Sequence, residues 1–230
     1  MKFIPFFLLV FFNLFAQNEK NLVFPETDYL YREDQFYVAG TFHVIGDRPT
    51  GIDQTGFSGG LDFGFIRDMP INKKRNVAFG IGLGYSANVY NHDLFVDDSS
   101  TTTLYREVET DDNLDNNRFS VHSIEMPIQF RWRTSTPESY KFWRVYGGVQ
   151  LGYMYYFNVR TLDESGNRTS IKNPDGLDRL RMGASLSFGW NTFNFYMYYG
   201  LNPLFDESVE VIDQQGAFNI IKFGLMFYIL

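Results

Sequence analysis

Cysteine is absent from this sequence of 230 residues, and histidine occurs only three times. The lack of cysteine excludes a disulfide framework, thiol chemistry and attachment of a lipid to a cysteine. Beyond residue 16, no apolar run approaches the ~20 residues that a membrane-spanning helix needs. The formal net charge of -7 argues against a nucleic acid as a partner.

The first sixteen residues have the pattern of a secretory signal peptide. Lys2 precedes an apolar run from Phe3 to Phe12, and Ala16 stands before the expected cleavage point. We expect an exported chain in which residues 17–34 form a polar periplasmic lead-in and residues 35–230 form one domain.

Aromatic side chains are abundant: they make up 19% of the chain, with 25 Phe and 15 Tyr. They recur at every second position, as in Phe193, Phe195 and Tyr199, and this alternation predicts β-strands with one apolar face. Segments of about 10–15 residues have the length of a tilted membrane strand. The alternating segments are Gln35–Gly46, Phe57–Ile66, Val77–Tyr90, Phe119–Arg133, Phe142–Phe157, Leu180–Trp190, Phe193–Phe205 and Phe218–Leu230.

These segments predict an all-β fold, an eight-stranded antiparallel transmembrane up-and-down β-barrel with a polar, side-chain-filled interior. The last segment ends in alternating aromatic and apolar residues, Phe223-Gly224-Leu225-Met226-Phe227-Tyr228-Ile229, and resembles the C-terminal insertion signal of outer-membrane barrels. We therefore expect the protein in the lipid bilayer of the outer membrane. A soluble β-sandwich is the alternative left open.

The predicted connections alternate in length, and outer-membrane barrels keep their short turns in the periplasm. The long connection Asn91–Arg118 is rich in carboxylates, whereas basic residues gather near the short connections. The short connections are Arg67–Asn76, Thr134–Lys141 and Asn191–Thr192. With this orientation all three tryptophans fall at periplasmic strand ends, as an interfacial girdle would place them: Trp132, Trp143 and Trp190.

The hairpin Ile124–Gly148 carries the clearest two-faced pattern. A turn at Thr134–Lys141 pairs Trp132 with Trp143, both facing lipid, and pairs Arg131 with Arg144 inside the barrel. Unpaired buried cations are unfavourable, so we expect carboxylates beside these arginines, namely Asp62 and Glu125. The complete predicted interior network is Asp62, Glu125, Gln129, Arg131, Arg144, Gln150, Arg181 and Lys222.

Two features that resemble ligand sites have simpler interpretations. Gly80, Gly82 and Gly84 lack the spacing and the following helix of a nucleotide loop, so we expect them to make room for large inward neighbours such as Asp62. Asp111 opens a calcium-loop-like run, but Asn116 replaces the required glycine and His122 the required glutamate. No metal or cofactor is predicted, although weak calcium binding to the outer loops stays open.

An outer-membrane enzyme is a third possibility. His43 and His92 are expected near the outer rim, where Asp93 and Ser120 are nearby in the sequence. No motif joins them into a nucleophile, a base and an orienting group. We therefore expect no catalytic residues.

The same hairpin resembles that of the PorT (SprT) family, outer-membrane β-barrels of Bacteroidota associated with type IX secretion. The resemblance is carried by Glu125, Pro127, Arg131-Trp132-Arg133, Ser135-Thr136-Pro137, Tyr140-Lys141-Phe142-Trp143-Arg144 and Tyr146-Gly147.

This resemblance implies a non-enzymatic component of type IX protein secretion and gliding motility, with other secretion proteins as partners at the periplasmic turns. A stand-alone receptor or adhesin with acidic outer loops is the alternative. The partner-binding or supporting residues implied are Arg131, Trp132, Arg133, Pro137, Trp143 and Arg144.

Overall fold

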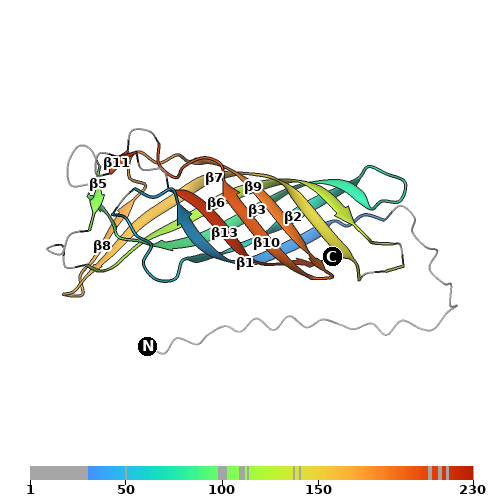
Figure 1. Ribbon diagram of the computed structural model, residues 1–230, viewed down its shortest axis with the longest axis horizontal. Coiled ribbons are helices and arrows are strands. Elements are labelled where there is room, and N and C mark those ends of the chain that lie inside the picture. The colour runs from blue at the N-terminus through green and yellow to red at the C-terminus, as the bar shows by residue number, and fades with distance from the viewer. Residues whose placement is uncertain are drawn as a thin grey trace, which may run out of the picture.

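The computed structural model describes residues 31–49, 51–97, 103–108, 112, 114–136, 138–139, 141–206, 209–211, 214–215 and 218–229. The expected signal peptide, most of the lead-in and Pro137 lie outside these residues. Within the described part, the main element is an antiparallel sheet that closes on itself, as Figure 1 shows.

The barrel strands are β1 (Gln35–Gly46), β2 (Gly59–Pro70), β3 (Val77–Asn91), β6 (Leu114–Arg133), β7 (Trp143–Asp163), β9 (Leu180–Trp190), β10 (Phe193–Gly200) and β13 (Asn219–Ile229). They follow the order β6-β3-β2-β1-β13-β10-β9-β7, and pairing of β6 with β7 closes the ring. The prediction of an eight-stranded antiparallel barrel is confirmed.

Five shorter strands lie at one end, called here the loop end; the opposite end is the turn end (Figure 1). The short strands are β4 (Leu94–Asp97), β5 (Leu104–Glu107), β8 (Arg168–Lys172), β11 (Glu210–Val211) and β12 (Gln214–Gln215). β4 pairs with β5, and β8 extends the main sheet beside β7. The segment Asn91–Arg118, expected as one loop, therefore contains strand structure.

Several strand ends differ from the prediction. β2 continues through Asp68 to Pro70, while β6 begins at Leu114 and β7 runs to Asp163. β10 ends at Gly200 instead of Phe205. Beyond the apolar band, β6 and β7 keep pairing with each other, so the strands continue where the lipid-facing pattern has stopped.

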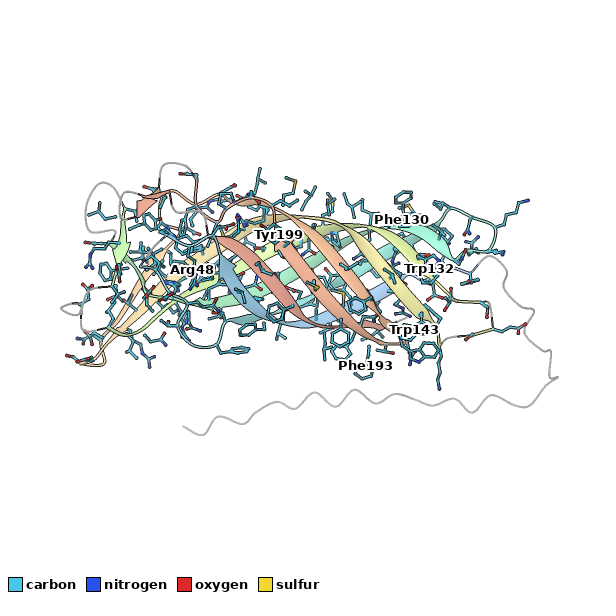
Figure 2. All side chains as sticks on the ribbon, in the orientation of Figure 1. Arg48, Phe130, Trp132, Trp143, Phe193 and Tyr199 are labelled. Atoms are coloured by element: carbon cyan, nitrogen blue, oxygen red, sulfur yellow. The ribbon has the colours of Figure 1, made fainter. Side chains whose placement is uncertain are left out.

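The outer surface carries the apolar half of the alternation. In β10, Phe193 and Tyr199 are exposed (Figure 2). Phe195 is exposed as well, whereas Asn194 and Tyr196 are buried. A band of exposed Phe, Leu, Ile and Trp side chains stays out of water only in lipid, as in membrane barrels. Among the described residues, no helix is long and apolar enough to cross a bilayer.

The interior is layered along the barrel axis. Buried arginines fill the turn end, and a lysine with two carboxylates occupies the middle. At the loop end the filling is apolar, a cluster that includes Phe119, Phe157 and Phe205 under the outer loops. The predicted polar filling therefore holds for the first two layers, and the third is an ordinary hydrophobic core.

Candidate functional site

The hairpin of β6 and β7 has the predicted faces but a different register. Trp132 lies opposite Val145, and Arg133 lies opposite Arg144, so the expected pairs Trp132–Trp143 and Arg131–Arg144 are wrong. A shift by two residues keeps every side chain on its face, because the side-chain period of a strand is two.

The tryptophans point outward as predicted. Trp132 and Trp143 are both exposed near the turn end, as Figure 2 shows. Trp143 pairs with Trp190 across β7 and β9, and their ring centroids are 5.5 Å apart. The three rings fit an interfacial girdle at the turn end.

Asp68 is the carboxylate that neutralises the turn-end arginines. Arg133 donates to both of its oxygens at 2.8 Å, and Arg131 donates to one of them at 2.8 Å. All three side chains are fully buried. The expectation that Asp62 and Glu125 would pair with these arginines is wrong, because both lie deeper in the barrel.

Arg144 is held mainly by aromatic faces. Its guanidinium lies 4.5 Å from the ring centroid of Phe142 and 5.4 Å from that of Tyr228. Arg131 stacks in the same way on Tyr146, at 4.2 Å. Cation–π contacts of this kind stabilise a cation that is removed from water, each by about 0.5–2 kcal/mol.

Residues 31–34, called here the strap, close the turn end of the barrel. The backbone carbonyl of Glu33 accepts a hydrogen bond from Arg131 at 3.2 Å, and Asp34 accepts from the backbone of Asp68 at 2.8 Å. Tyr31 reaches Ser135, with its hydroxyl 3.1 Å from the serine oxygen. Burial raises the pKa of the Glu33 carboxyl. The last residues of the predicted lead-in thus belong to the barrel structure.

The middle layer is built around Lys222. Its ammonium lies 3.5 Å from Asp62 and 3.7 Å from Glu125, and it donates to Ser86 at 3.2 Å. Gln150 donates to Glu125 and accepts from Tyr196 at 3.0 Å. Four predicted network members, Asp62, Glu125, Gln150 and Lys222, therefore meet in one cluster.

The remaining network members are spread out. Gln129 is buried, but its side-chain oxygen has no partner among the described atoms. Arg181 donates to the backbone carbonyls of Asn202, at 2.8 Å, and Pro203, near the loop end. The predicted interior set is thus inward-facing, but it forms separate layers instead of one network.

Glycines on β3 leave the space that these side chains fill. A Cβ added to Gly80 would stand 2.8 Å from Cδ of Arg131, and one added to Gly82 would stand 2.8 Å from Cγ1 of Ile66. At Gly84 it would collide with the hydroxyl of Tyr37. The large neighbours are therefore Arg131, Ile66 and Tyr37, where the sequence suggested Asp62.

A basic pocket of about 490 Å³ opens beside the strap at the turn end. Lys73 and Lys74 in the β2–β3 turn are exposed, and Arg75 donates to the carbonyl of Tyr31 at 2.5 Å. The lining residues are Tyr31, Lys73, Lys74, Arg75, Asn76, Arg133, Thr134, Ser135 and Thr136. Its position and charge suit an acidic group presented from outside the membrane.

The histidines do not assemble a catalytic group in the described residues. His43 lies inside the barrel, where its Nε2 shares a 2.8 Å hydrogen bond with Thr41. His92 is buried against Phe119 and accepts from the backbone of Leu94 at 3.1 Å. Both lie toward the loop end, as expected, but both are buried, and neither is hydrogen-bonded to a serine or a carboxylate in the described residues.

The calcium-like run falls partly outside the described residues, which omit Asp111 and Asn113. Asp112 forms a two-pronged ion pair with Arg106, with both hydrogen bonds at 2.6 Å. In the described residues, no group of His, Cys, Asp and Glu side chains is arranged to hold a metal ion.

Sequence reasoning missed Asp68 and Arg133 as interior residues. The predicted turn Arg67–Asn76 includes Asp68, although Asp68 has the same parity as Asp62 on the same strand. Arg133 continues the parity of Arg131 on β6. If the alternation of inward and outward residues is continued by two residues, beyond Ile66 on β2 and beyond Arg131 on β6, it predicts Asp68 and Arg133 as inward residues.

The chain was compared with curated proteins, with solved structures and with models of protein families. No curated protein matches the chain. Among solved structures, Ail, the attachment invasion locus protein of Yersinia pestis, is 10% identical with a TM-score of 0.36, over 86% of this chain and 97% of its own. A structure described as "Asymmetric conductivity of engineered proteins" is 11% identical with a TM-score of 0.23, over 85% and 99%.

The family comparison is the informative one. A model of the outer membrane protein beta-barrel domain matches residues 15–206, most of the chain. The closed antiparallel barrel and its apolar outer band are the architecture that this description names. The chain belongs to the outer membrane protein beta-barrel domain family.

Proposed function

We propose that this protein is a non-enzymatic outer-membrane component of the type IX protein secretion apparatus, and that it engages an acidic segment of a periplasmic partner at its turn end. The specific part of this proposal comes from the resemblance of Ile124–Gly148 to the PorT (SprT) hairpin. Since outer-membrane barrels keep short turns in the periplasm, the turn end faces that compartment.

The observation that carries the proposal is the basic pocket between the β2–β3 turn and the β6–β7 hairpin. Lys73 and Lys74 are exposed there, next to Ser135 and Thr136 of the hairpin. A concave, positively charged site attracts an acidic partner and orients it. The chain as a whole has a net charge of -7, so the cations of this pocket contrast with the acidic character of the rest of the protein.

The hairpin residues divide into two roles. The side chains of Arg131, Arg133 and Arg144 are buried, so these arginines support the mouth of the barrel, and Arg133 also forms part of the pocket wall. Trp132 and Trp143 face the lipid boundary and anchor the hairpin there. The residues proposed to contact the partner are therefore the exposed cations of the pocket, Lys73 and Lys74.

A charge reversal of the pocket tests the proposal in cells. We expect Lys73→Glu combined with Lys74→Glu to block export of type IX substrates while the barrel still inserts, because both side chains are exposed and lack a structural partner in the described residues. The conservative pair Lys73→Arg and Lys74→Arg keeps the charge and is the matched control. Secreted substrate in the medium and barrel in the outer-membrane fraction are measured together.

Two outcomes would contradict the proposal. Normal secretion by the inserted charge-reversed barrel would remove the pocket from the function. Loss of function on deletion of residues 91–117, with Lys73 and Lys74 dispensable, would instead indicate a receptor or adhesin that works from the loop end.

A further inference from the structure

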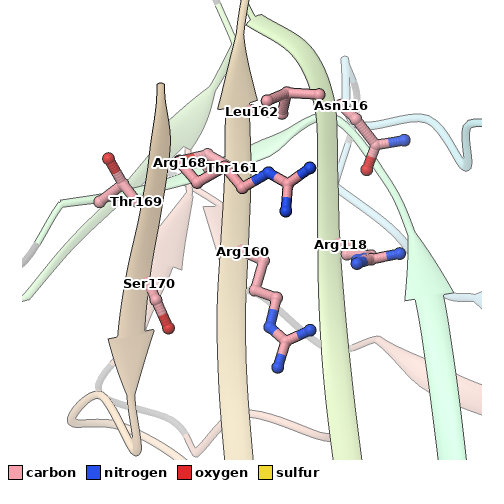
Figure 3. A pocket seen from close by; sticks show the side chains of 8 residues that line it. All are labelled: Asn116, Arg118, Arg160, Thr161, Leu162, Arg168, Thr169 and Ser170. Carbon is pink, nitrogen blue, oxygen red and sulfur yellow. The ribbon is translucent and has the colours of Figure 1, made fainter. Parts of the chain in front are cut away.

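The outer face of the sheet at the loop end carries a concentration of arginines. Arg118 on β6 lies directly opposite Arg160 on β7, and Arg168 on β8 is paired with the neighbouring Leu162. All three arginines are exposed. They line one open pocket of about 570 Å³ together with Asn116, Thr161, Leu162, Thr169 and Ser170, as Figure 3 shows.

A bound anion would stabilise this arrangement. Like charges directly opposite each other on paired strands are destabilising. Within the described part of the chain, none of the three guanidinium groups forms a salt bridge. Asp163, the carboxylate nearest in sequence to Arg160, is occupied by Asn167, which donates to it at 2.7 and 2.8 Å.

The central arginine is positioned from behind. The amide of Asn158, oriented so that its nitrogen donates to Ser170 and Ile171, accepts a hydrogen bond from Nε of Arg160 at 2.9 Å. Asn158 is itself buried. This contact uses Nε of Arg160, and its two terminal nitrogens make no hydrogen bond within the described residues. A planar guanidinium binds phosphate with two parallel hydrogen bonds.

The pocket lies at the outer boundary of the apolar band. A band of ~25 Å is crossed by about ten residues of a strand that is tilted by ~40°. Trp132 marks the boundary of the band at the turn end. Ten residues from it along β6, toward the start of the strand, the opposite boundary falls near His122, and Arg118 lies beyond it. The three arginines therefore stand at the height of lipid head groups.

A second groove, of about 420 Å³, continues from the first toward the membrane and shares Arg160 with it. Its walls include the aromatic side chains of Tyr85, His122 and Tyr155, and Tyr85 shares a 2.6 Å hydrogen bond with His122. Cations above an amphipathic aromatic wall match a molecule that has a phosphate at one end and an apolar body below it.

We propose that Arg118, Arg160 and Arg168 form a binding site for the phosphate group of a phosphorylated glycolipid in the outer leaflet, with its sugar ring against Tyr85 and Tyr155. The site lies on the lipid-facing side and at the end opposite the basic pocket of the turn end. It is therefore independent of the secretion proposal.

Native mass spectrometry of the detergent-solubilised full chain tests this site, with diphosphoryl lipid A as the probe. We expect discrete lipid adducts whose affinity falls at least about tenfold in the triple variant Arg118→Gln, Arg160→Gln, Arg168→Gln, because charge-assisted two-pronged bonds are lost. The matched control removes three exposed cations near the turn end that lie outside the basic pocket: Arg32→Gln, Arg67→Gln and Lys141→Gln. This control should bind the lipid as the unmodified protein does.

Two further probes identify the source of the phosphate. Dephosphorylated lipid A should lose most of the affinity, and inorganic phosphate should compete only weakly, since it lacks the sugar and acyl contacts. Equal binding of lipid A by the triple variant and the unmodified protein would overturn the site. Competition by inorganic phosphate or soluble polyphosphate as strong as that by lipid A would overturn its assignment to a lipid.

Correct folding is checked by the shift in gel mobility that barrels show on heating. The variant Arg118→Lys, Arg160→Lys, Arg168→Lys keeps the charge but lacks the planar fork. Intermediate affinity in this variant supports phosphate coordination, whereas unchanged affinity would reduce the site to nonspecific charge attraction and overturn the proposed geometry.

Discussion

At the scale of single residues, the turn end of the barrel depends on Asp68. This one carboxylate compensates Arg131 and Arg133, both of which are out of contact with water. Ions buried in a protein persist only when they are paired and hydrogen-bonded, and removing one partner leaves the other uncompensated. The cluster is therefore a sensitive point of the structure, while exposed ion pairs such as Arg67–Asp34 contribute little.

Replacing Asp68 by Asn should strongly destabilise the barrel. We expect a loss of about 3–5 kcal/mol in the free energy of unfolding, because two buried guanidinium groups lose their counterion. Urea unfolding of the protein folded into lipid vesicles measures this. Arg67→Gln, which removes an exposed partner of Asp34, is the control and should change the free energy by less than about 1 kcal/mol. Equal stability of the Asp68→Asn protein and the unmodified one would contradict the assignment.

A second residue makes the outer loops sensitive to acid. Burial lowers the pKa of His92 from 6.5 to about 3, so this ring is neutral in the folded loop. Below pH 6.5 the unfolded loop binds a proton that the folded loop does not bind. The contribution of His92 to the free energy of folding is therefore fully present above pH 6.5 and is lost as the pH falls toward 3. Burial raises the pKa of Asp93, which acts in the opposite direction.

Hydrogen exchange of the β4–β5 hairpin tests this behaviour. We expect protection factors, corrected for intrinsic exchange, to fall between about pH 6.5 and about pH 4 in the unmodified protein. In His92→Phe the ring next to Phe119 is kept and the titrating group is removed, so this response should disappear. The same acid response in both proteins would show that His92 is not its source.

At the scale of elements, β3 illustrates how a strand makes room for its neighbours. Its inward glycines are contacted by Arg131 from β6 and by Tyr37 from β1, so a small residue on one strand accommodates a large one on the next. This complementarity lets Arg131 pack directly against the backbone of β3. In the middle layer, little open volume is left, and a cavity of only about 30 Å³ remains.

Gly80→Ala tests that fit directly. The added methyl group would stand 2.8 Å from Cδ of Arg131 and 2.9 Å from Ile66, so it displaces the arginine from Asp68. We expect a loss of about 1–3 kcal/mol in the free energy of unfolding, the usual effect of overpacking. Gly147→Ala is the matched control, because its methyl group points outward with 3.6 Å to the nearest atom of Leu186. Two equal effects would contradict the inward packing.

Elements were predictable from the sequence wherever lipid imposed the pattern. The ends of β1 and β9 agree with the alternating segments, since both strands stop close to the edge of the apolar band. The extensions of β6 and β7 were missed because pairing outside the membrane has no lipid-facing side to mark it. The register of the β6–β7 hairpin was also missed, since a slip of two residues leaves the pattern of faces unchanged.

At the scale of the whole molecule, the barrel has a charged turn end, a neutralised middle and an apolar core under the outer loops. The inward position of the predicted network followed from parity alone. Its division into layers did not, because the pairing of Asp68 with Arg131 and of Asp62 with Lys222 depends on strands that are distant in the sequence. The arginine pocket of the outer face depends on β8, for which no alternating segment was recognised.

The central claim is that successive side chains of one strand face lipid and a sealed interior in turn. The chain has no cysteine, so single cysteines can be placed along β10 and spin-labelled in lipid vesicles without removing native ones. Collision rates with oxygen, which dissolves in lipid, should alternate with period two, high at Phe193, Phe195, Met197 and Tyr199 and low at the residues between them. A period of 3.6 residues, or access of a water-soluble reagent to both faces, would contradict the barrel.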